Sequence, residues 1–258
     1  MIDTHAHLYD IKFDCDRDAV VARAVECGVE RMLLPNIDIE SIQPMFEACR
    51  RYPKHCFPML GLHPTSIDKN FEQKLEKIAS YLDTNEIVAI GETGIDLYWD
   101  RQYLEQQMES FRIHIGWAKK YGLPLSIHCR KSYNEIMSIL KKEQDGSLSG
   151  VFHCFPGNLR QAEEVTKLGF KLGIGGVATY KNAEMATVVQ QIAIEHILTE
   201  TDAPYLPPLP FRGKRNESAY ICNIVQKIAE LKSMSINEVA ETTNINAERI
   251  FFHDFVKI

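Results

Sequence analysis

The sequence predicts an α/β fold, a single (β/α)8 TIM-type barrel that spans residues 1–258 and has its active site at the C-terminal mouth. Three observations predict this fold. Strand-like and helix-like segments alternate along the chain. The length of 258 residues is close to the usual size of such a barrel, about 250 residues. Several apolar runs end on histidine or carboxylate side chains, as expected where parallel strands open into a functional mouth.

Most of the candidate strands are continuous apolar runs, which is typical of strands buried on both faces. They cover residues 1–6, 30–35, 56–61, 86–91, 123–128, 150–153, 170–174 and 196–201. Strands that alternate with helices form either a closed barrel or an open doubly wound sheet. The polar strand ends belong to the first, fourth, fifth, sixth and eighth segments, and a barrel mouth would bring all of them together. No G-x-G-x-x-G motif follows the first strand, which counts against a dinucleotide-binding sheet.

The segments between the strands have the apolar spacing of helices. Clear stripes are formed by Ile39, Ile42, Met45, Phe46 and Cys49, by Leu104, Met108, Phe111 and Ile115, and by Met185, Val188, Val189 and Ile192. Gly122 follows a helical run where a C-terminal cap is expected. Ser235 and Glu238 form a candidate capping box for the last helix. The proline-rich residues 203–210 predict a loop over the barrel mouth.

The composition is that of a globular protein, with 45% hydrophobic and 25% charged residues. A formal net charge of −6 argues against bulk electrostatic binding to nucleic acid, although it permits a nuclease with a local basic patch. The seven cysteines include no C-x-x-C pair, so we expect reduced thiols in a cytoplasmic protein. The first strand begins at Met1 and leaves no room for a signal peptide, and no apolar run reaches the roughly 18 residues of a membrane helix.

The first and fourth strands supply three candidate metal ligands. His5 and His7 are two residues apart, so both imidazoles lie on one face of the first strand and can bind one divalent cation. The alternative is a polar pair near the start of the chain. Glu92 follows the fourth strand, and its two oxygens can bridge two metals; the alternative is a helix-capping carboxylate. Related barrel hydrolases use a modified lysine as this bridge, but residues 86–98 contain none.

The fifth, sixth and eighth strands end on further candidate ligands. His128 and His153 each follow an apolar run, although a histidine in such a place is often a core residue. Asp202 can both hold a metal and accept a proton from bound water, whereas its alternative is an Asx turn before Ala203. Glu200 shares the strand face of Asp202 and is the weaker ligand candidate.

Several motifs together resemble those of the TatD-type metal-dependent deoxyribonucleases, a family of the metal-dependent hydrolase superfamily. They are Asp-Thr-His-Ala-His at 3–7, Gly-Glu-Thr-Gly-Ile-Asp at 91–96, Leu-Pro-Leu-Ser-Ile-His at 123–128, Phe-His-Cys-Phe-Pro-Gly at 152–157, Thr-Glu-Thr-Asp-Ala-Pro-Tyr at 199–205 and Arg-Gly-Lys-Arg-Asn-Glu at 212–217. The resemblance covers nearly the whole chain and implies a two-metal site that cleaves nucleic acid. It implies one metal held by His5, His7, Glu92 and Asp202, and a second held by Glu92, His128 and His153. Pro156 and the run from Ile95 to Trp99 depart mildly from the family pattern, which bears on substrate fit.

Other residues are candidates for substrate contact. By the resemblance, His63 in Gly-Leu-His-Pro faces the substrate; the alternative is a loop histidine. Basic residues after the fifth and eighth strands could bind phosphate, unless they are only solvated: Arg130, Lys131, Arg212, Lys214 and Arg215. Trp99 and Tyr98 could stack on an unpaired base, although rim aromatics often only pack. We expect structural roles for the remaining histidines, His55, His114, His196 and His253.

The leading hypothesis is a divalent-metal-dependent hydrolase that cleaves phosphodiester bonds of DNA, a deoxyribonuclease or exonuclease acting on single-stranded or frayed ends. Two metals, about 3.5–4 Å apart, would activate water, with Asp202, Glu92 and His63 as the catalytic residues. Imidazole ligands suit zinc, manganese, cobalt or iron better than magnesium. No obligatory protein partner is expected. The alternatives are an amide or ester hydrolase of a small molecule and a non-catalytic metal-binding protein.

Overall fold

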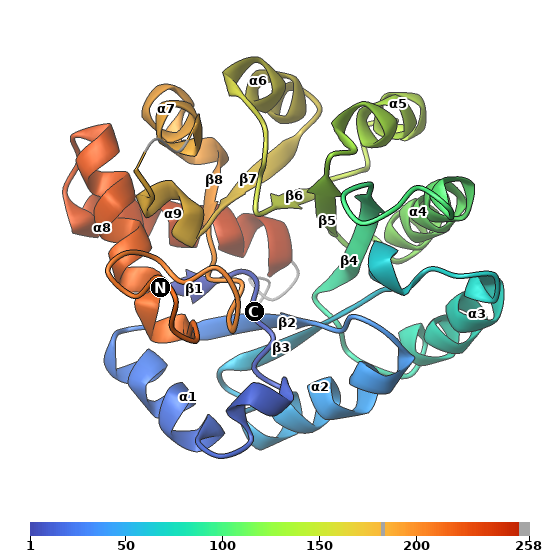
Figure 1. Cartoon of the computed structure of the whole chain (residues 1–258), viewed down its shortest axis with the longest axis horizontal. Helices are drawn as coiled ribbons and strands as arrows, with labels where there is room; N and C mark the ends of the chain where they lie inside the picture. The colour runs from blue at the N-terminus through green and yellow to red at the C-terminus, as the bar shows by residue number, and fades with distance from the viewer. Residues whose placement is uncertain (182–183, 253–258) are drawn as a thin grey trace.

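The computed structural model describes residues 1–181 and 184–252, and in these residues eight parallel strands form a ring in the order β1 to β8. Figure 1 shows the ring in the centre of the molecule, with the helices outside it. This arrangement confirms the (β/α)8 barrel that the sequence predicts. The strands are β1 (Ile2–Asp3), β2 (Arg31–Pro35), β3 (Cys56–Leu60), β4 (Ala89–Asp96), β5 (Leu125–Arg130), β6 (Gly150–His153), β7 (Phe170–Ile174) and β8 (Ile197–Thr199).

The barrel closes between β1 and β8 through backbone and side-chain hydrogen bonds. Thr4 N donates to Thr199 O at 3.0 Å, and Thr199 Oγ1 donates to Ile2 O at 3.2 Å. Beyond the strand ends, Asp202 N donates to the carbonyl oxygen of His5 at 2.9 Å. The first and last strand ends are therefore held against each other, so the metal-ligand candidates of both strands meet at the mouth.

The fourth strand differs from its prediction. The sequence places a strand at 86–91 that ends before Glu92, but β4 continues to Asp96 and Glu92 lies inside it. The pairing of β4 with β5 shifts register between Ile90 and Thr93, where Gly91 and Gly94 have positive φ values of 154° and 131°. A Cβ at Gly94 would lie 2.1 Å from the carbonyl oxygen of His128, so glycine allows this close approach of the two strands.

The helices that cover the strands are α1 (Arg17–Glu26), α2 (Ile39–Arg51), α3 (Phe71–Leu82), α4 (Leu104–Tyr121), α5 (Tyr133–Glu143), α6 (Leu159–Lys167), α7 (Glu184–Gln191) and α8 (Ile221–Lys232). Gly122 ends α4 in a left-handed conformation, as predicted. A further helix, α9 (Ile236–Phe251), opens with the predicted capping box of Ser235 and Glu238. None of the helices in the described ranges has the length and apolar composition needed to cross a membrane.

The end of the barrel opposite the mouth is closed by α9. Ala247, Ile250 and Phe251 of this helix, with Phe252, pack against apolar side chains from the strands, namely Ile2, Leu33, Met59, Val88, Ala89, Val151 and Leu198. Asn246 Nδ2 also donates to the carbonyl oxygens of Ile194 and Ile197, both at 2.9 Å. The helix is therefore fixed to the strands by both apolar packing and hydrogen bonds.

Candidate metal centre

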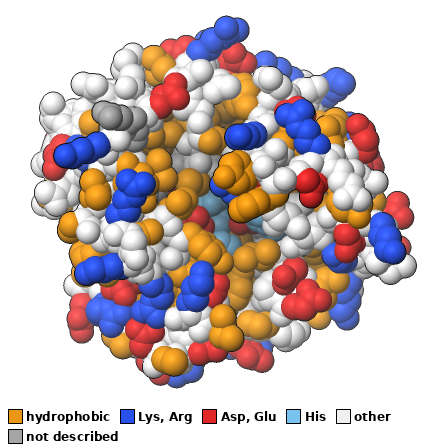
Figure 2. Space-filling view, in the orientation of Figure 1, with side chains coloured by type: hydrophobic (Ala, Val, Ile, Leu, Met, Phe, Trp, Pro, Cys, Tyr) orange, Lys and Arg blue, Asp and Glu red, His pale blue; other side chains and the backbone are white. Residues whose placement is uncertain are grey.

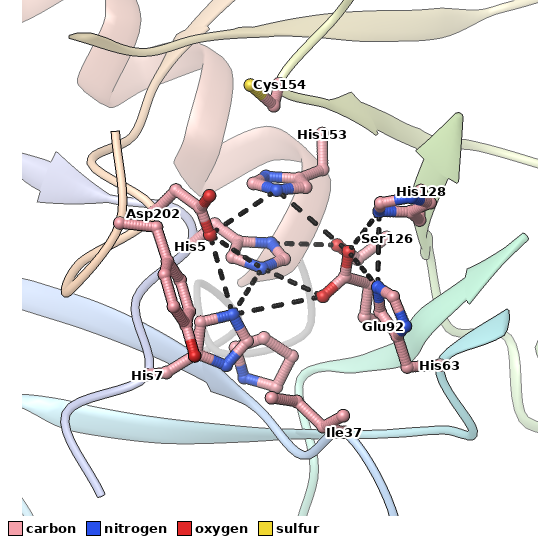
Figure 3. A network of polar contacts seen from close by, with 12 residues as sticks. His5, His7, Ile37, His63, Glu92, Ser126, His128, His153, Cys154 and Asp202 are labelled. Carbon is pink, nitrogen blue, oxygen red and sulfur yellow. Dashed lines mark hydrogen bonds and ion pairs between the residues drawn. The ribbon is translucent and has the colours of Figure 1, made fainter. Parts of the chain in front are cut away.

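All six predicted metal ligands, together with His63, converge at the C-terminal mouth of the barrel. Figure 3 shows their side chains pointing toward one another from the strand ends, and Figure 2 shows histidines at the floor of a central hollow. The hollow corresponds to a cavity of about 340 Å³ lined by His7, Ile37, His63, Thr65, Glu92, Asp96, Trp99, His128, Arg130, His153, Asp202 and Tyr205. The predicted loop after β8 reaches it through Tyr205. Five of the six ligand candidates thus line one solvent-accessible cavity, and the fully buried His5 lies behind them.

Glu92 lies at the centre of this site and divides its two oxygens between two sets of imidazoles. Oε2 is 3.2 Å from His5 Nε2 and 3.9 Å from His7 Nε2. Oε1 is 2.9 Å from His128 Nδ1 and 3.3 Å from His63 Nε2. The side chain is only 3% exposed, so its position is set by these neighbours. A carboxylate placed in this way can contact two cations, one on each side.

Asp202 and His153 complete the side of the site that contains His5. Asp202 Oδ1 is 3.5 Å from His7 Nε2 and 3.6 Å from His153 Nε2. The rings of His5 and His153 are stacked, with their centroids 3.4 Å apart. The side chain of Asp202 is 14% exposed, more than that of Glu92, and it lines the cavity. Asp202 is therefore more accessible than Glu92 to water in the cavity.

The donor atoms are close enough to surround metal ions. Three groups each have all their ligand atoms within 4.8 Å of one another: His5, His7 and Glu92; His5, His153 and Asp202; and His63, Glu92 and His128. Imidazole and carboxylate donors of this kind are those that zinc, manganese, cobalt and iron prefer. The residues therefore fit the metal centre that the sequence predicts. The grouping differs from the one that the resemblance implies: His153, expected with Glu92 and His128, lies with His5 and Asp202, and His63 takes its place beside Glu92 and His128.

The protonation states of Glu92, Asp202 and His5 suit a cation. Burial would raise the pKa of Glu92, but the imidazoles of His63 and His5 outweigh burial and hold it well below its usual range. Burial would also raise the pKa of Asp202, but the contact with His7 and the charges that His153 and His5 carry when protonated outweigh burial and lower it. Burial lowers the pKa of His5 to about 4. Near neutral pH both carboxylates are ionised and His5 is neutral, the states in which these groups bind metals.

Hydrogen-bond partners behind two histidines assign their tautomers. The hydroxyl of Tyr9 donates to Pro35 O at 2.7 Å, so its oxygen accepts from His7 Nδ1, which is 3.0 Å away. His128 Nε2 is 2.9 Å from Asp96 Oδ2 and donates to it. When the rings are neutral, the nitrogen facing the site, Nε2 of His7 or Nδ1 of His128, is therefore the one with the lone pair. Burial lowers the pKa of His128, but its contacts with Asp96 and Glu92 outweigh burial and raise it, so a cation would displace a proton from this ring. Both rings are oriented as metal ligands.

In His63 the nitrogen that faces the site carries the proton, unlike in His7 and His128. Its Nδ1 accepts from the backbone N–H of Thr65 at 3.2 Å, and it also contacts the Thr65 hydroxyl at 2.6 Å. The neutral ring then carries its proton on Nε2, the nitrogen that faces Glu92. This tautomer donates a hydrogen bond into the site rather than a lone pair to a cation. The geometry thus favours the predicted substrate-facing role of His63 over a ligand role.

Two carboxylates support the ligands from behind, and the sequence identified neither role. Asp96 holds His128 as described above, and its other oxygen accepts from Tyr98 N at 2.8 Å. Glu200 is fully buried; its Oε1 lies 3.0 Å from His153 Nδ1 and accepts from Cys154 N at 2.5 Å. The charge of Glu200 outweighs burial and raises the pKa of His153 to about 10. Asp96 could have been found from its spacing, since it lies an even number of residues after Glu92 on the same strand.

The predicted phosphate-binding residues occupy different positions. Arg130 lines the cavity beside the ligands. Lys131 lies over the Tyr98 ring, with Nζ 5.2 Å from its centroid. Arg212 and Lys214 lie over the rings of Tyr180 and Phe211, at 4.8 Å and 5.9 Å. Arg215 pairs with both oxygens of Asp16 at 2.7 Å, and its role as a phosphate ligand would require this pair to open.

The other three histidines of the described residues lie away from the ligand groups. His114 is fully buried, accepts from Leu62 N at 3.0 Å and donates from Nδ1 to Ser110 O at 2.7 Å. His55 Nδ1 contacts Glu30 O at 2.9 Å. His196 ends a short 3-10 helix before β8. His253 lies outside the described residues.

A family model described as TatD related DNase matches residues 2–252 of the chain. The chain belongs to the TatD-related DNase family. YabD of Bacillus subtilis, described as an uncharacterized metal-dependent hydrolase, is 38% identical over 252 residues, covering 97% of this chain and 98% of YabD. The TatD of Pectobacterium carotovorum, described as a 3'-5' ssDNA/RNA exonuclease, is 30% identical over 257 residues, covering 97% of this chain and 99% of that protein. The family named from the sequence motifs is thus confirmed.

A solved TatD-family structure has the same architecture. The crystal structure of YjjV from Escherichia coli, a TatD homolog, matches with a TM-score of 0.91 at 30% identity and covers 97% of each chain. An amidohydrolase from Saccharomyces cerevisiae, only 18% identical, matches with a TM-score of 0.82 and shows the shared fold. As a TatD-family member the protein is a metal-dependent hydrolase, and the mouth holds the residues suited to its metal.

Proposed function

We propose that this protein is a deoxyribonuclease that hydrolyses phosphodiester bonds at single-stranded or frayed DNA ends, using two divalent cations. The observation that carries the proposal is Glu92, whose oxygens face His5 and His7 on one side and His128 on the other. A carboxylate shared in this way is what a two-metal site requires. When bound, two cations would lower the pKa of a water molecule between them and neutralise charge developing on the phosphate.

The residues of the chain have separate roles in this proposal. Glu92 bridges the two positions, and the imidazoles of His5, His7, His128 and His153 with Asp202 hold the cations. Asp202 is ionised and reaches the cavity, so it accepts the proton of the attacking water. His63 donates from Nε2 to a non-bridging phosphate oxygen. Each assignment follows from the direction in which the side chain presents its donor or acceptor.

The substrate class is supported by the charge of the mouth and by a relative. Arg130 lines the cavity, and a guanidinium can grip phosphate oxygens bidentately. Lys131 follows Arg130 in sequence, and Arg212, Lys214 and Arg215 lie in the loop after β8. In this proposal these residues contact the part of a longer DNA strand that extends beyond the cavity, and Arg215 does so after its pair with Asp16 opens. The Pectobacterium carotovorum relative is described as acting on single-stranded DNA and RNA. We extend that substrate class to this chain.

The cations are zinc, manganese, cobalt or iron in this proposal, with magnesium as a possible substitute in an assay, because the donors are mainly imidazoles. We also place the protein in the cytoplasm. The cysteines of the described residues, Cys15, Cys27, Cys49, Cys56, Cys129, Cys154 and Cys222, are all free thiols, as in a reducing compartment.

A substrate panel tests the proposal. Metal-stripped protein, reloaded separately with Mn²⁺, Zn²⁺ or Mg²⁺, is given a labelled single-stranded oligonucleotide, a blunt duplex, a lactone, a carboxylic ester and an amide. We expect hydrolysis of the oligonucleotide that needs metal and exceeds hydrolysis of the duplex. Faster turnover of the lactone, ester or amide, with an intact oligonucleotide, would assign the site to carbonyl chemistry instead.

A further inference from the structure

Two aromatic residues stand exposed on the rim of the metal cavity. Trp99 and Tyr98, in the segment after β4, are 70% and 46% exposed. Trp99 lines the metal cavity and also an adjoining cavity of about 220 Å³, which is lined by Pro64, Thr65, Ile67, Asp96, Asp100, Tyr103 and Gln107 as well. Its ring is nearly perpendicular to that of Tyr98, at 87°, so the two rings are not stacked face to face. The two rings make an edge-to-face contact with their centroids 4.9 Å apart, and most of the indole surface is still exposed to a further partner.

Cationic side chains from the end of β5 lie against these rings. The Arg130 guanidinium is 3.8 Å from the Tyr98 ring centroid and 5.5 Å from that of Trp99. Among residues 1–181 and 184–252, no carboxylate lies within ion-pair distance of Arg130. Its charge is thus held beside the metal cavity by aromatic contact and remains available to an anion. The rim at this point combines an exposed flat ring with an unpaired cation.

The rim on the side of α1 and α2 has the opposite charge. A cavity of about 750 Å³ there shares Ile37 with the metal cavity and is lined by the carboxylates of Asp10, Asp14, Asp38, Glu40 and Glu47. Arg17 and Arg51 also line it, but they pair with Asp14 and Asp18. A polyanion leaving the metal site would be repelled on this side and attracted toward Arg130. The difference in charge between the two sides of the rim therefore favours a path over Arg130 for a bound polyanion.

We propose that Trp99 and Arg130 form a binding subsite for one unpaired nucleobase and its flanking phosphate, which directs a single strand into the metal site. This inference rests on the proposed nuclease function. The indole stacks on the base and the guanidinium binds the phosphate beside it. A base paired within a duplex does not expose its face to the indole, so the subsite selects single-stranded or frayed ends. Aromatic stacking of this kind changes affinity by roughly 5- to 100-fold per base.

The first test is fluorescence, because the chain contains only two tryptophans. Trp117→Phe leaves Trp99 as the sole reporter. Metal-free Trp117→Phe protein is titrated with a ten-nucleotide single strand, the same strand with an abasic residue at either terminus, and a blunt duplex. We expect the intact strand to quench Trp99 at the lowest concentration. Two results would overturn the subsite. One is that both abasic strands, the one modified at the 5' terminus and the one modified at the 3' terminus, quench Trp99 as well as the intact strand does. The other is that no probe quenches Trp99.

The second test is kinetic, and it uses metal-loaded protein. Trp99→Ala should raise KM for the single strand by roughly 5- to 100-fold with a much smaller change in kcat, and Trp99→Phe should restore most of the affinity. Discrimination between intact and abasic termini should disappear in Trp99→Ala. The matched control is Ile11→Ala, since Ile11 is 79% exposed on the acidic side and should not alter KM. Melting temperature and metal content check that each variant folds.

The outcomes separate this inference from the proposed function. If wild type degrades the oligonucleotide and Trp99→Ala has the same KM and the same abasic discrimination, the subsite is wrong and the nuclease stands. If the intact strand quenches Trp99 but no metal supports its hydrolysis, the subsite stands and the nuclease is wrong. Neither quenching nor hydrolysis would overturn both.

Discussion

The two ends of the barrel are built on the same strands but from opposite chemistry. At the closed end, Ile2 of β1 and Leu198 of β8 pack against α9. At the mouth, the segments that follow these strands present His5 and Asp202 to the metal site. Apolar burial stabilises the closed end, whereas the mouth buries imidazoles and carboxylates that need one another or a cation as partners. A barrel can therefore carry a polar site at one end because its other end is closed by packing.

The largest expected effect is on catalysis at the mouth. Asp202→Asn keeps the size of the side chain but cannot accept a proton, so kcat for a single-stranded oligonucleotide should fall by about 10²–10⁴-fold. Single-turnover cleavage by metal-loaded protein measures this loss. Asp83→Asn, a change to a 68% exposed carboxylate at the end of α3, is the control and should cleave at the wild-type rate. Wild-type cleavage by a folded Asp202→Asn protein would show that the proton of the attacking water goes to another group.

A substitution at the closed end should lower stability and leave catalysis unchanged. Phe251→Ala removes a buried ring of α9 that is 3% exposed, and it should lower the free energy of unfolding by about 3–5 kcal/mol. Denaturant titration measures the loss. The rate per folded molecule and the metal content should remain those of wild type, because no ligand contacts this ring. A folded variant that loses metal would show that the two ends are not independent.

His114 offers a buried imidazole without a carboxylate partner. Burial lowers its pKa from 6.5 to about 4, so the unfolded chain binds this proton before the folded protein does. Its contribution to stability is complete above pH 6.5 and is lost as the pH falls to about 4, a loss of about 3 kcal/mol. His114→Gln should be less stable at pH 8 but lose less stability between pH 7 and pH 4. Parallel pH profiles of unfolding for the two proteins would contradict this assignment.

The smallest effect is expected behind the ligands. The carboxylate of Glu200 contacts the His153 ring. It also lies against Gly173, where a Cβ would be 2.2 Å from Glu200 Oε2. Glu200→Gln preserves the shape but removes the charge, and it should weaken metal binding by about 10–100-fold. Competition with a metal-binding dye measures the affinity without an activity assay. Glu195→Gln, in the short helix before β8, is the control; equal affinities in both variants would leave Glu200 with a packing role only.

The sequence predicted the barrel and the convergence of the ligand candidates at its mouth, because both depend on local patterns. Apolar runs that end on His128 and His153 are visible in the sequence, and closure of the barrel brings these histidines together. The extension of β4 past Glu92 was not predictable in this way, because it depends on the register with β5. The pairing of Arg215 with Asp16 joins residues far apart in sequence, and no local signal indicates it.

The tautomers of the histidines also could not be predicted from the sequence. His63 and His128 look alike as histidines at strand ends, and only their partners, Thr65 N for one and Asp96 for the other, show which nitrogen faces the site. Asp96 is the residue whose signal was overlooked. Its even spacing from Glu92 was readable, but the sequence did not show that β4 extends over both residues, and the register shift inside β4 disturbs the simple alternation of faces.

The central claim is that Glu92 bridges two cations, and counting bound metal tests it most directly. Metal-free wild type, His5→Ala and Glu92→Ala are titrated with Mn²⁺ by calorimetry, and oligonucleotide cleavage is followed at each metal ratio. We expect wild type to bind two cations and to reach full activity only with both. Glu92→Ala should weaken both sites and lose more activity than His5→Ala, which serves one site. Full activity of wild type with one cation, or equal metal content and rates in the two variants, would contradict the bridging role.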